Sequence, residues 1–569
     1  MLRDAAVTKP LTQGAAAATF AQVSTVGINP VVTHGAVGDG QDVRGAAITS
    51  GSAVVTASGA GFTTKAKVGQ LAYFYGAGAA GALLATTIAS VDSDTQVTLA
   101  ATAGTTVASA GVFTFGTDNT TAMTNAINAA KAVGGPGAVV VPAGLYLMTG
   151  TLPAMTNARD VRIGGAGTTT MSYGTYVTPA IGRTEIRYMG SGAGTFLPVT
   201  NTKGFLLHDI TIAYGNPGFT GDLVSTNTSW NPRFMRCSFR GAISGVGLTQ
   251  AVLFFGAATV EGVWEDCIFE RAKYAFRFQA YFNANTLSRC VFLALQSINA
   301  ASQGGWGWGT TFNKCTFEPR GPESSPTADP FGTPSNLNLQ GSRSASIIDC
   351  AWWDGGDASG EAWITLQGTF GTRISGGLWV AGSYSQERLI FLNGTNTGLT
   401  IEALHVESGA GAAKVFTYSG SQILRDYTMG AITINGSPTT LGFDEIPFTE
   451  LTWASRPATG HSERAVVAAS GAAQTLSATA EVNAITLTAN CTITIPATIA
   501  YKKSSKRARI LLTQDATGSW TVIWAGGTIK WAGGAAPTLS TVAGRTDEIV
   551  LETHDLGTTW FGRAVGTYY

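Results

Sequence analysis

Two glutamates in the middle of the chain, Glu270 and Glu318, occupy the same place in a repeated sequence phrase, three residues after Cys267 and Cys315. If the phrases form stacked strands about 4.8 Å apart, the two glutamates face outward two rungs apart, roughly 10 Å between backbones. Inverting glycoside hydrolysis uses carboxyl groups ~6.5–9.5 Å apart, one protonating the leaving oxygen while the other activates water. We predict Glu270 and Glu318 as a catalytic pair; the alternative is two solvated glutamates on a β surface.

More carboxylates and several tryptophans flank this pair. Asp354 and Glu361 follow the next repeated phrase and are substitutes for either glutamate. Sugar rings stack on aromatic faces and hydrogen-bond at the rim, so Trp353 and either Trp306 or Trp308 are predicted sugar platforms. Core packing is the alternative explanation for tryptophans in this stretch.

Basic side chains surround the same stretch. Arg271, Arg277 and Arg320 are predicted to pair with a uronate or another acidic sugar, with surface solvation as the alternative. A lyase would instead need a base beside a cation that neutralises the uronate, and Lys273 and Tyr274 lie next to Arg277. Hydrolysis and β-elimination therefore both stay open.

A cysteine repeat must position these groups. A basic or acidic residue, a cysteine, and an aromatic residue two positions later recur at intervals of 30, 23, 25 and 35 residues between cysteines. Repeats of this length indicate a solenoid. Strand side chains alternate, so the thiols and the aromatic rings are predicted to form two adjacent internal columns. The five phrases are Arg236–Phe239, Asp266–Phe269, Arg289–Phe292, Lys314–Phe317 and Asp349–Trp352.

The residue before each cysteine is predicted to point outward and to form a charge ladder with modest ion pairing. The cysteines lack the close pairs of a zinc site, and their unequal intervals do not suit a disulfide framework. We therefore predict no metal site and no cofactor.

The N-terminal third divides into an arm over 1–28 and a cap over 29–150 that contains a β subdomain at about 41–117. A helix starting at Asp118 or Thr120 is predicted from apolar residues at helical spacing. These residues are Ala122, Met123, Ala126, Ile127 and Ala130.

Three motifs carry a family resemblance: GAVGDG at 35–40, DNTTA followed by AINAA at 118–130, and GGPGAVVVPAGLYLMTGTL at 134–152. Together they are similar to the opening of the pectate-lyase-like right-handed β-helix superfamily, as seen in bacteriophage tailspikes. In that family the helix normally follows the GDG motif closely, so 41–117 is interpreted as an insertion. The resemblance implies a parallel β-helix, here predicted over 151–449 as the catalytic domain.

Past a linker at 450–462, the segment 463–569 alternates polar and apolar residues, which is typical of half-buried antiparallel strands. It resembles the C-terminal β-sandwich domains of tail fibres and tailspikes. Such domains support trimerisation or bind carbohydrate.

Composition limits the possible partners. With 35 basic and 35 acidic residues among 569, the chain has no net charge, which argues against a nucleic-acid or anionic-membrane binder. No apolar stretch is long enough to span a bilayer, and the N-terminus lacks a secretory apolar core. We expect synthesis in a host cytoplasm and action elsewhere after lysis.

The resemblance implies a homotrimeric, all-β tailspike in the virion tail that depolymerises capsular or O-antigen polysaccharide at the bacterial surface. Because 1–28 is short, attachment through another phage tail protein is expected unless the chain is a piece of a longer one. The alternatives are a polysaccharide lyase, a non-catalytic carbohydrate-binding fibre and a purely structural virion part.

Overall fold

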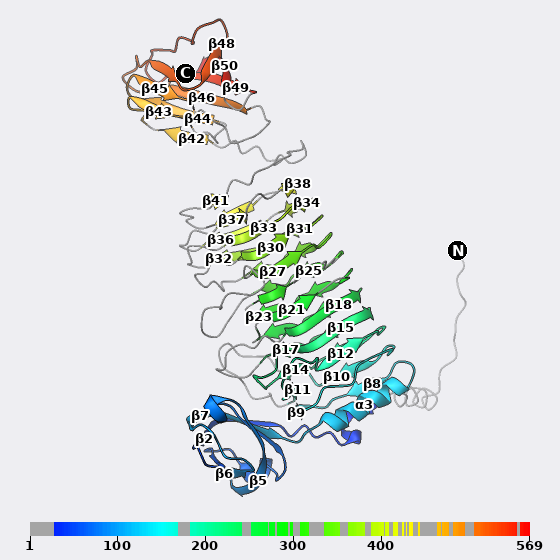
Figure 1. Ribbon diagram of the computed structural model, residues 1–569. Coiled ribbons are helices and arrows are strands. Elements are labelled where there is room, and N and C mark those ends of the chain that lie inside the picture. The colour runs from blue at the N-terminus through cyan, green and yellow to red at the C-terminus, as the bar shows by residue number, and fades with distance from the viewer. Residues whose placement is uncertain are drawn as a thin grey trace, which may run out of the picture. The chain divides into compact units, whose positions relative to one another are not determined.

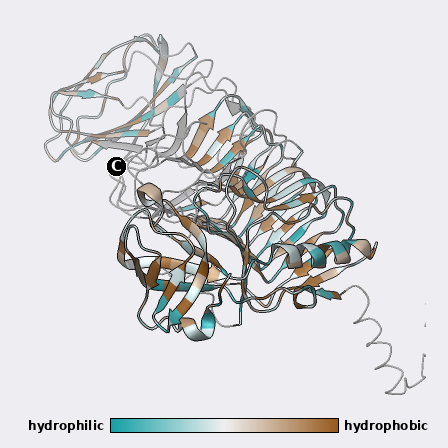
Figure 2. Cartoon of the chain, turned by 60° about the horizontal axis from the view of Figure 1, so that its bottom comes forward, coloured by the Kyte–Doolittle hydropathy of each residue, from teal (hydrophilic) through white to brown (hydrophobic). Residues whose placement is uncertain are grey.

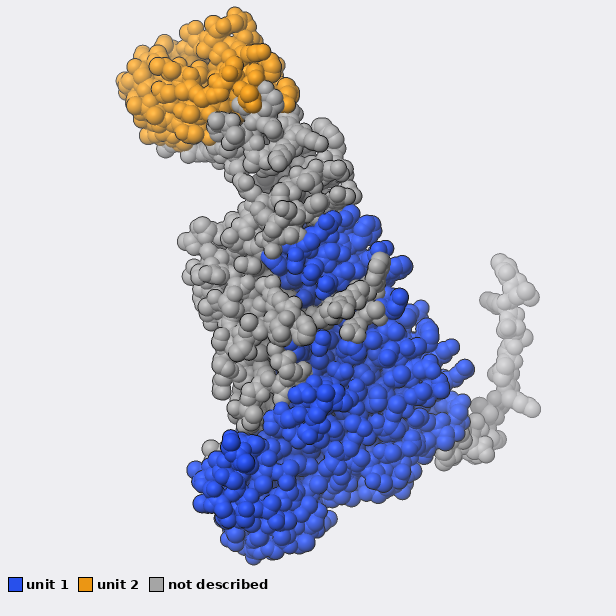
Figure 3. Space-filling model, viewed as in Figure 1, with its two compact units in different colours: residues 1–447 blue, residues 448–569 orange. Residues whose placement is uncertain are grey.

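The computed structural model is built almost entirely from β-strands (Figure 1). It divides into two compact units, residues 1–447 and 448–569 (Figure 3). The described residues are 28–168, 182–241, 252–270, 272, 274–278, 281–293, 296–299, 308–317, 335–352, 362–381, 388–402, 404–408, 414–418, 424–425, 428–429, 432–435, 442–443, 464–467, 469–476, 482–495, 506–554 and 558–568.

The first unit is a parallel β-solenoid in which each coil adds one strand to each of three sheets. Sheet 1 consists of β1 (Ile28–Pro30), β8 (Ala138–Val140), β10 (Arg162–Gly164), β13 (Leu206–His208), β16 (Arg233–Met235), β19 (Val263–Glu265), β22 (Thr286–Ser288), β25 (Thr311–Asn313), β28 (Ser346–Ile348), β31 (Arg373–Ser375), β35 (Thr400–Glu402) and β39 (Thr428–Met429). Sheet 2 consists of β9 (Gly144–Met148), β11 (Thr184–Tyr188), β14 (Thr211–Tyr214), β17 (Ser238–Arg240), β20 (Ile268–Glu270), β23 (Val291–Leu293), β26 (Thr316–Phe317), β29 (Ala351–Trp352), β32 (Leu378–Ala381), β36 (Leu404–Ser408) and β40 (Ile432–Asn435).

Sheet 3 closes each coil before the chain returns to sheet 1. Its strands are β12 (Leu197–Thr200), β15 (Asp222–Trp230), β18 (Val252–Val260), β21 (Tyr274–Phe278), β24 (Gln296–Asn299), β27 (Ser335–Gln340), β30 (Ala362–Gln367), β33 (Arg388–Asn393), β37 (Lys414–Tyr418) and β41 (Gly442–Phe443). Two short strands, β34 (Asn396–Thr397) and β38 (Leu424–Arg425), pair between sheets 3 and 1. The predicted solenoid is confirmed; its right-handedness and a homotrimer stay predictions.

The interior contains the two predicted columns, and hydrophobic residues recur on strand after strand (Figure 2). All five repeat cysteines are buried, and their thiols donate to backbone carbonyls, as from Cys237 Sγ to Leu207 O at 3.3 Å. The adjacent rings stack with centroids 5.0 Å apart at every step. These rings are Phe239, Phe269, Phe292, Phe317 and Trp352. The thiols are therefore small packing groups, as predicted.

The corner between sheets 1 and 2, which we call the cysteine corner, carries the predicted charge ladder. The residue before each repeat cysteine has a φ between 49° and 53°, in the left-handed region. Arg236 pairs with Asp209 at 2.6 Å, and Arg289 pairs with Asp266 at 2.7 Å. These pairs are largely exposed, so each stabilises the fold by only about 0–1 kcal/mol.

Helix α3 (Thr120–Ala132) covers the N-terminal end of the solenoid, where it contacts β1, β8 and the 3-10 helix η1 (Val31–His34). The five apolar residues predicted for its inner face are all buried. The helix begins after Asn119, and the Asp118 carboxylate accepts the Thr120 N–H at 3.0 Å.

The predicted insertion is a closed six-stranded barrel. Its strands are β2 (Gln41–Ile48), β3 (Val54–Thr56), β4 (Leu71–Phe74), β5 (Leu84–Ser93), β6 (Gln96–Leu99) and β7 (Val107–Gly116), with the short helices α2 (Phe62–Lys65) and η2 (Ala79–Gly81). Phenylalanines such as Phe62, Phe74 and Phe113 fill its core.

The two ends of the barrel meet beside β9, which explains how the family motif tolerates so long an insertion. Asp39 accepts the Thr117 N–H at 2.9 Å and the Thr117 hydroxyl at 2.8 Å. Gly40 donates to Leu145 O at 2.9 Å, and a Cβ on Gly40 would lie 2.5 Å from the Leu145 side chain. The glycine is therefore required for this close approach.

The second unit corrects the predicted antiparallel sandwich. One sheet has the order β42 (Arg464–Val467), β44 (Val482–Leu487), β46 (Lys506–Gln514), β49 (Thr546–Thr553), β50 (Thr559–Tyr568) and β48 (Thr528–Trp531), and the other has β43 (Ala473–Thr475), β45 (Cys491–Thr494) and β47 (Val522–Ala525). Only the pairs β46–β49 and β49–β50 are antiparallel among the described strands. Successive strands up to β47 alternate between the sheets, so neighbours within a sheet run parallel. Alternation of polar and apolar residues indicates that one face of a strand is buried, but it does not indicate whether neighbouring strands run parallel or antiparallel.

Candidate functional site

Two long connections of the solenoid lie between sheets 2 and 3, at a corner that we call the long-loop corner; the connection from β10 to β11, residues 165–183, lies instead between sheets 1 and 2. Residues 318–334 separate β26 from β27, and residues 353–361 separate β29 from β30. By contrast, two residues join β16 to β17, and two join β15 to β16. Long connections on a rigid scaffold are where binding and catalytic groups concentrate.

Asp222 opens β15 at this corner. The register aligns it with Val252 on β18 and Tyr274 on β21. Burial raises the pKa of Asp222 to about 6, while the charge of Arg277 opposes that rise. A carboxyl that keeps its proton close to neutral pH is suited to act as a general acid.

Sequence reasoning missed Asp222 because it lies outside the cysteine phrases. The available signal was an aspartate directly after Gly221, at the start of a nine-residue strand. Burial of its carboxyl, which depends on the neighbouring coils, could not be read from that signal.

Arg277 and Tyr274, predicted for sugar binding or elimination, lie together on β21. The guanidinium carbon of Arg277 is 5.4 Å from the centroid of the Tyr274 ring. Tyr274 is only 1% exposed, so its phenol is shielded from solvent. Arg277 is half-buried and therefore reachable, whereas Tyr274 is poorly placed to act as a base on a polymer.

Glu270 lies on the outer face of sheet 2, as predicted, but it is not solvated. It is 3% exposed, and its strand neighbours are Arg240 and Leu293. The alternative interpretation of Glu270 as a solvated surface glutamate is therefore wrong, because this part of the outer face is covered. Its catalytic role stays a prediction.

Glu270 continues a column of buried charges on sheet 2. Arg187 Nε donates to Glu185 Oε1 at 2.7 Å, and Arg240 donates to the other oxygen of Glu185. Burial alone would raise the pKa of Glu185, but Arg187 and Arg240 outweigh it and hold the pKa below its usual range. Ala213, between the two arginines in the register, leaves room for them to converge on one carboxylate.

The remaining predicted site residues lie outside the described residues, and their roles stay predictions. The register aligns Phe269 with Phe292 and Phe292 with Phe317, so the strands that precede Glu270 and Glu318 in the sequence are two rungs apart. The residues outside the description are Glu318, Asp354, Glu361, Trp306, Trp353, Arg271, Arg320 and Lys273.

Trp308 lies away from this group. It is 51% exposed and sits at the turn from sheet 3 to sheet 1, where the Arg343 guanidinium stacks on its ring at 5.6 Å. The expectation that Trp308 and Glu270 share one side is wrong, because each belongs to a different corner of the coil.

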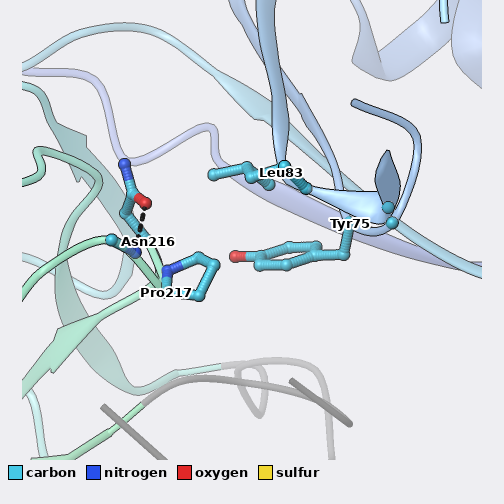
Figure 4. A pocket seen from close by; sticks show the side chains of 8 residues that line it. Tyr75, Leu83, Asn216 and Pro217 are labelled. Atoms are coloured by element: carbon cyan, nitrogen blue, oxygen red, sulfur yellow. Dashed lines mark hydrogen bonds between the residues drawn. The ribbon is translucent and has the colours of Figure 1, made fainter. Parts of the chain in front are cut away.

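A pocket of about 360 Å³ lies where the barrel meets the solenoid (Figure 4). Tyr75 and Leu83 line it from the barrel, and Asn216 and Pro217 line it from the turn after β14. The Tyr75 hydroxyl donates to Gly215 O at 2.7 Å, and burial raises the pKa of this phenol. The pocket lining contains no carboxylate, histidine or cysteine, so we interpret it as a seam between the barrel and the solenoid.

Other kinds of site find no support in the described residues. Within them, no three His, Cys, Asp or Glu side chains are grouped so as to hold a metal ion. No helix in the described part of the chain is long and apolar enough to cross a membrane.

Comparison with known proteins agrees with the architecture. Residues 114–321 match the model of the family described as rhamnogalacturonase A/epimerase, pectate lyase-like. The solenoid is a pectate-lyase-like β-helix. No curated protein matches the chain.

Solved structures resemble the chain only distantly. Geobacillus virus E2 ORF18 is 16% identical with a TM-score of 0.35, over 56% of this chain and 59% of that one. The tailspike protein gp49 of Pseudomonas phage LKA1 is 11% identical with a TM-score of 0.30, over 72% of this chain and 67% of that one. PfbA, a surface adhesin of Streptococcus pneumoniae, is 12% identical with a TM-score of 0.37, over 79% of this chain and 95% of that one. Because the match to Geobacillus virus E2 ORF18 covers 59% of that protein, this chain spans less than two thirds of its length.

Proposed function

We infer that the protein binds a bacterial surface polysaccharide, capsule or O-antigen, and cleaves it by endo-glycosidic hydrolysis at the long-loop corner. The observation that carries this proposal is Asp222, a half-buried carboxyl at the start of β15 with a pKa raised to about 6. Hydrolysis of a glycosidic bond needs one carboxyl that is still protonated at working pH and a second that is ionised.

In the proposed mechanism, Asp222 donates its proton to the leaving glycosidic oxygen. An ionised carboxylate takes a proton from water as that water attacks the anomeric carbon. Glu270 is the first candidate for this base, because β20 lies two rungs from β14, the strand that precedes Asp222. Glu318, Asp354 and Glu361 follow β26 and β29, which lie four and five rungs from β14, about 19–24 Å at the strand spacing, so they are candidates for a pair with Glu270 and not with Asp222. Arg277 would bind an acidic group of the sugar.

The test is incubation with purified capsular polysaccharides and O-antigens, followed by mass spectrometry of the products. Asp222→Asn is expected to lower the cleavage rate by about 10²–10⁴-fold, the usual contribution of a general acid, while polymer binding persists. Asp209→Asn is the matched control, because Asp209 lies at the cysteine corner. Wild-type cleavage by the Asp222→Asn variant would reject the assignment.

The same products separate the alternatives. A lyase leaves an unsaturated sugar that absorbs in the ultraviolet, and a non-catalytic fibre binds without shortening the polymer.

The proposal includes a homotrimer held in the virion tail by another tail protein, made in the host cytoplasm and acting at the bacterial surface. Sedimentation of the purified chain tests the trimer. A monomer that still cleaves the polymer would separate the activity from the assembly.

A further inference from the structure

One corner of the solenoid, between sheets 3 and 1, carries a column of exposed aromatic and basic side chains, which we call the aromatic corner. At this corner, each member of the column is aligned with a residue of the next coil. Its members are Arg159, Lys203, Trp230, Val260, Asn283, Trp308, Arg343, Phe370 and Thr397.

Exposed large hydrophobic side chains concentrate at this corner. Over the described coils from β10 to β36, they are Trp230, Trp308 and Phe370, at 44–55% exposure, and Tyr281, at 64%. Three of them belong to the column, and Tyr281 lies two residues before Asn283. All four are aromatic. A general failure to bury apolar surface would leave aliphatic residues exposed too, so this pattern indicates a binding surface.

Two of the rings are held beside cations. Lys203 Nζ lies 5.5 Å from the Trp230 ring centroid, and the Arg343 guanidinium lies 5.6 Å from the Trp308 ring centroid. Each cation attracts the face of its ring and limits its rotation. Trp230 and Trp308 are three rungs apart, about 14 Å at the strand spacing, so the corner offers platforms along a line.

Hydroxyl groups lie beside this line on the outer face of sheet 1. Thr286, Thr311 and Ser346 are aligned in consecutive strands and are half-buried, whereas the residues that follow them point into the core. Hydroxyls next to aromatic faces are the combination that a sugar ring requires.

The charged members of the column are all basic. They are Arg159, Lys203 and Arg343. An anionic polymer is therefore favoured over a neutral one. The single-file arrangement suits a linear chain better than a second protein, since a stable protein interface needs a patch of about 800 Å² on each partner.

We propose that the aromatic corner is a second polysaccharide-binding site, separate from the long-loop corner, which holds a linear carboxylated glycan along Trp230, Trp308, Arg343 and Phe370. Its rings stack on sugar faces, and Arg343 pairs with a carboxylate. The site holds polymer whether or not the chain cleaves it.

The experiment measures retention of the full chain by polygalacturonate, alginate, hyaluronan and polysialic acid in affinity electrophoresis, each compared with its carboxyl-reduced form. We expect wild type to prefer at least one carboxylated polymer. Trp308→Ala should weaken that binding roughly tenfold or more. Arg343→Gln should remove most of the preference for carboxylates. Lys314→Gln, which removes a positive charge at the cysteine corner, should bind as wild type does.

The proposal is overturned if no carboxylated polymer is retained, if Trp308→Ala and Arg343→Gln bind as wild type does, or if an oligonucleotide of equal charge binds more tightly. Sedimentation of Trp308→Ala adds a further check: loss of an oligomer with unchanged glycan binding would assign the corner to contact between copies. If the wild-type chain retains polymer but does not cleave it, the result supports this site and rejects the proposed hydrolase. If the wild-type chain cleaves polymer and Trp308→Ala and Arg343→Gln bind it as wild type does, the result rejects this site and leaves the proposed hydrolase standing.

Discussion

The guanidinium of Arg187 donates to both carboxylate oxygens of Asp42, at 2.7 and 2.9 Å, and so joins a strand of the solenoid to a strand of the barrel. Both side chains are fully buried. Arg187 also donates to Glu185, and the Thr114 hydroxyl donates to Asp42 at 2.6 Å. The contact between barrel and solenoid therefore contains a charge pair that has no access to water.

We predict that Asp42→Ala lowers the free energy of unfolding by about 3–5 kcal/mol, because it leaves the Arg187 charge buried without its main partner. Urea denaturation followed by circular dichroism measures the change. Glu402→Ala is the control, since the exposed pair between Glu402 and Arg373 should contribute no more than about 1 kcal/mol. Equal small losses in both variants would contradict the prediction.

Stability should also depend on pH through Asp222. Its pKa is raised from 3.8 to about 6, so between these pH values the folded chain keeps a proton that the unfolded chain has released. The free energy of unfolding should therefore fall as pH rises from about 4 to 6, and Asp222→Asn should remove this fall. Denaturation of both proteins at several pH values tests this.

Asp209 should behave in the opposite way. Its hydrogen bond from Arg236 is the main reason that its pKa is lowered to about 2, despite partial burial. Its stabilising contribution is present above pH 4 and is lost as pH falls towards 2. If Asp209→Asn and Asp222→Asn changed the pH dependence in the same window, the assignment of Asp222 would be wrong.

The repeat made the solenoid core predictable. The cysteine and the aromatic residue two positions later obey the period of a strand, so the sequence alone indicated that Cys290 and Phe292 share one face. The buried face of α3 was predictable for the same reason, since Met123 and Ile127 obey the period of a helix. Both are local patterns, and packing of each coil on the next follows from them.

Most of the candidate site was not predictable, because it depends on which distant groups meet. Nothing local to Glu270 shows that its outer face is covered, and nothing local to Asp222 shows that its carboxyl is shielded. The aligned position of Trp308 and Arg343 depends on how unequal loops bring their coils into register. The parallel strands of the second unit were missed because alternation does not encode direction.

Phe292 tests the ring column. It stacks between Phe269 and Phe317 at 5.0 Å on each side. We predict that Phe292→Ala lowers the free energy of unfolding by about 3–5 kcal/mol, because neighbouring coils cannot collapse into the cavity. Phe370→Ala is the control, as that ring is 55% exposed and its removal should cost much less. Similar losses in thermal and urea denaturation would mean that the column is not a continuous core.

The cysteine corner tests backbone strain. Lys314 has a φ of 52°, and the equivalent residue two coils later, Gly376, has a φ of 68°. A Cβ on Gly376 would also lie 2.1 Å from Asp349 Oδ1. Gly376→Ala should therefore destabilise the fold by about 1 kcal/mol or more, because a side chain is strained in the left-handed region.

Lys314→Gly should be neutral or stabilising by up to about 1 kcal/mol, since release of this strain offsets the extra freedom of glycine in the unfolded chain. Asn313→Gly, on the adjacent strand residue, has no strain to release and should destabilise; if Lys314→Gly cost as much in urea denaturation, the left-handed turn would not be strained.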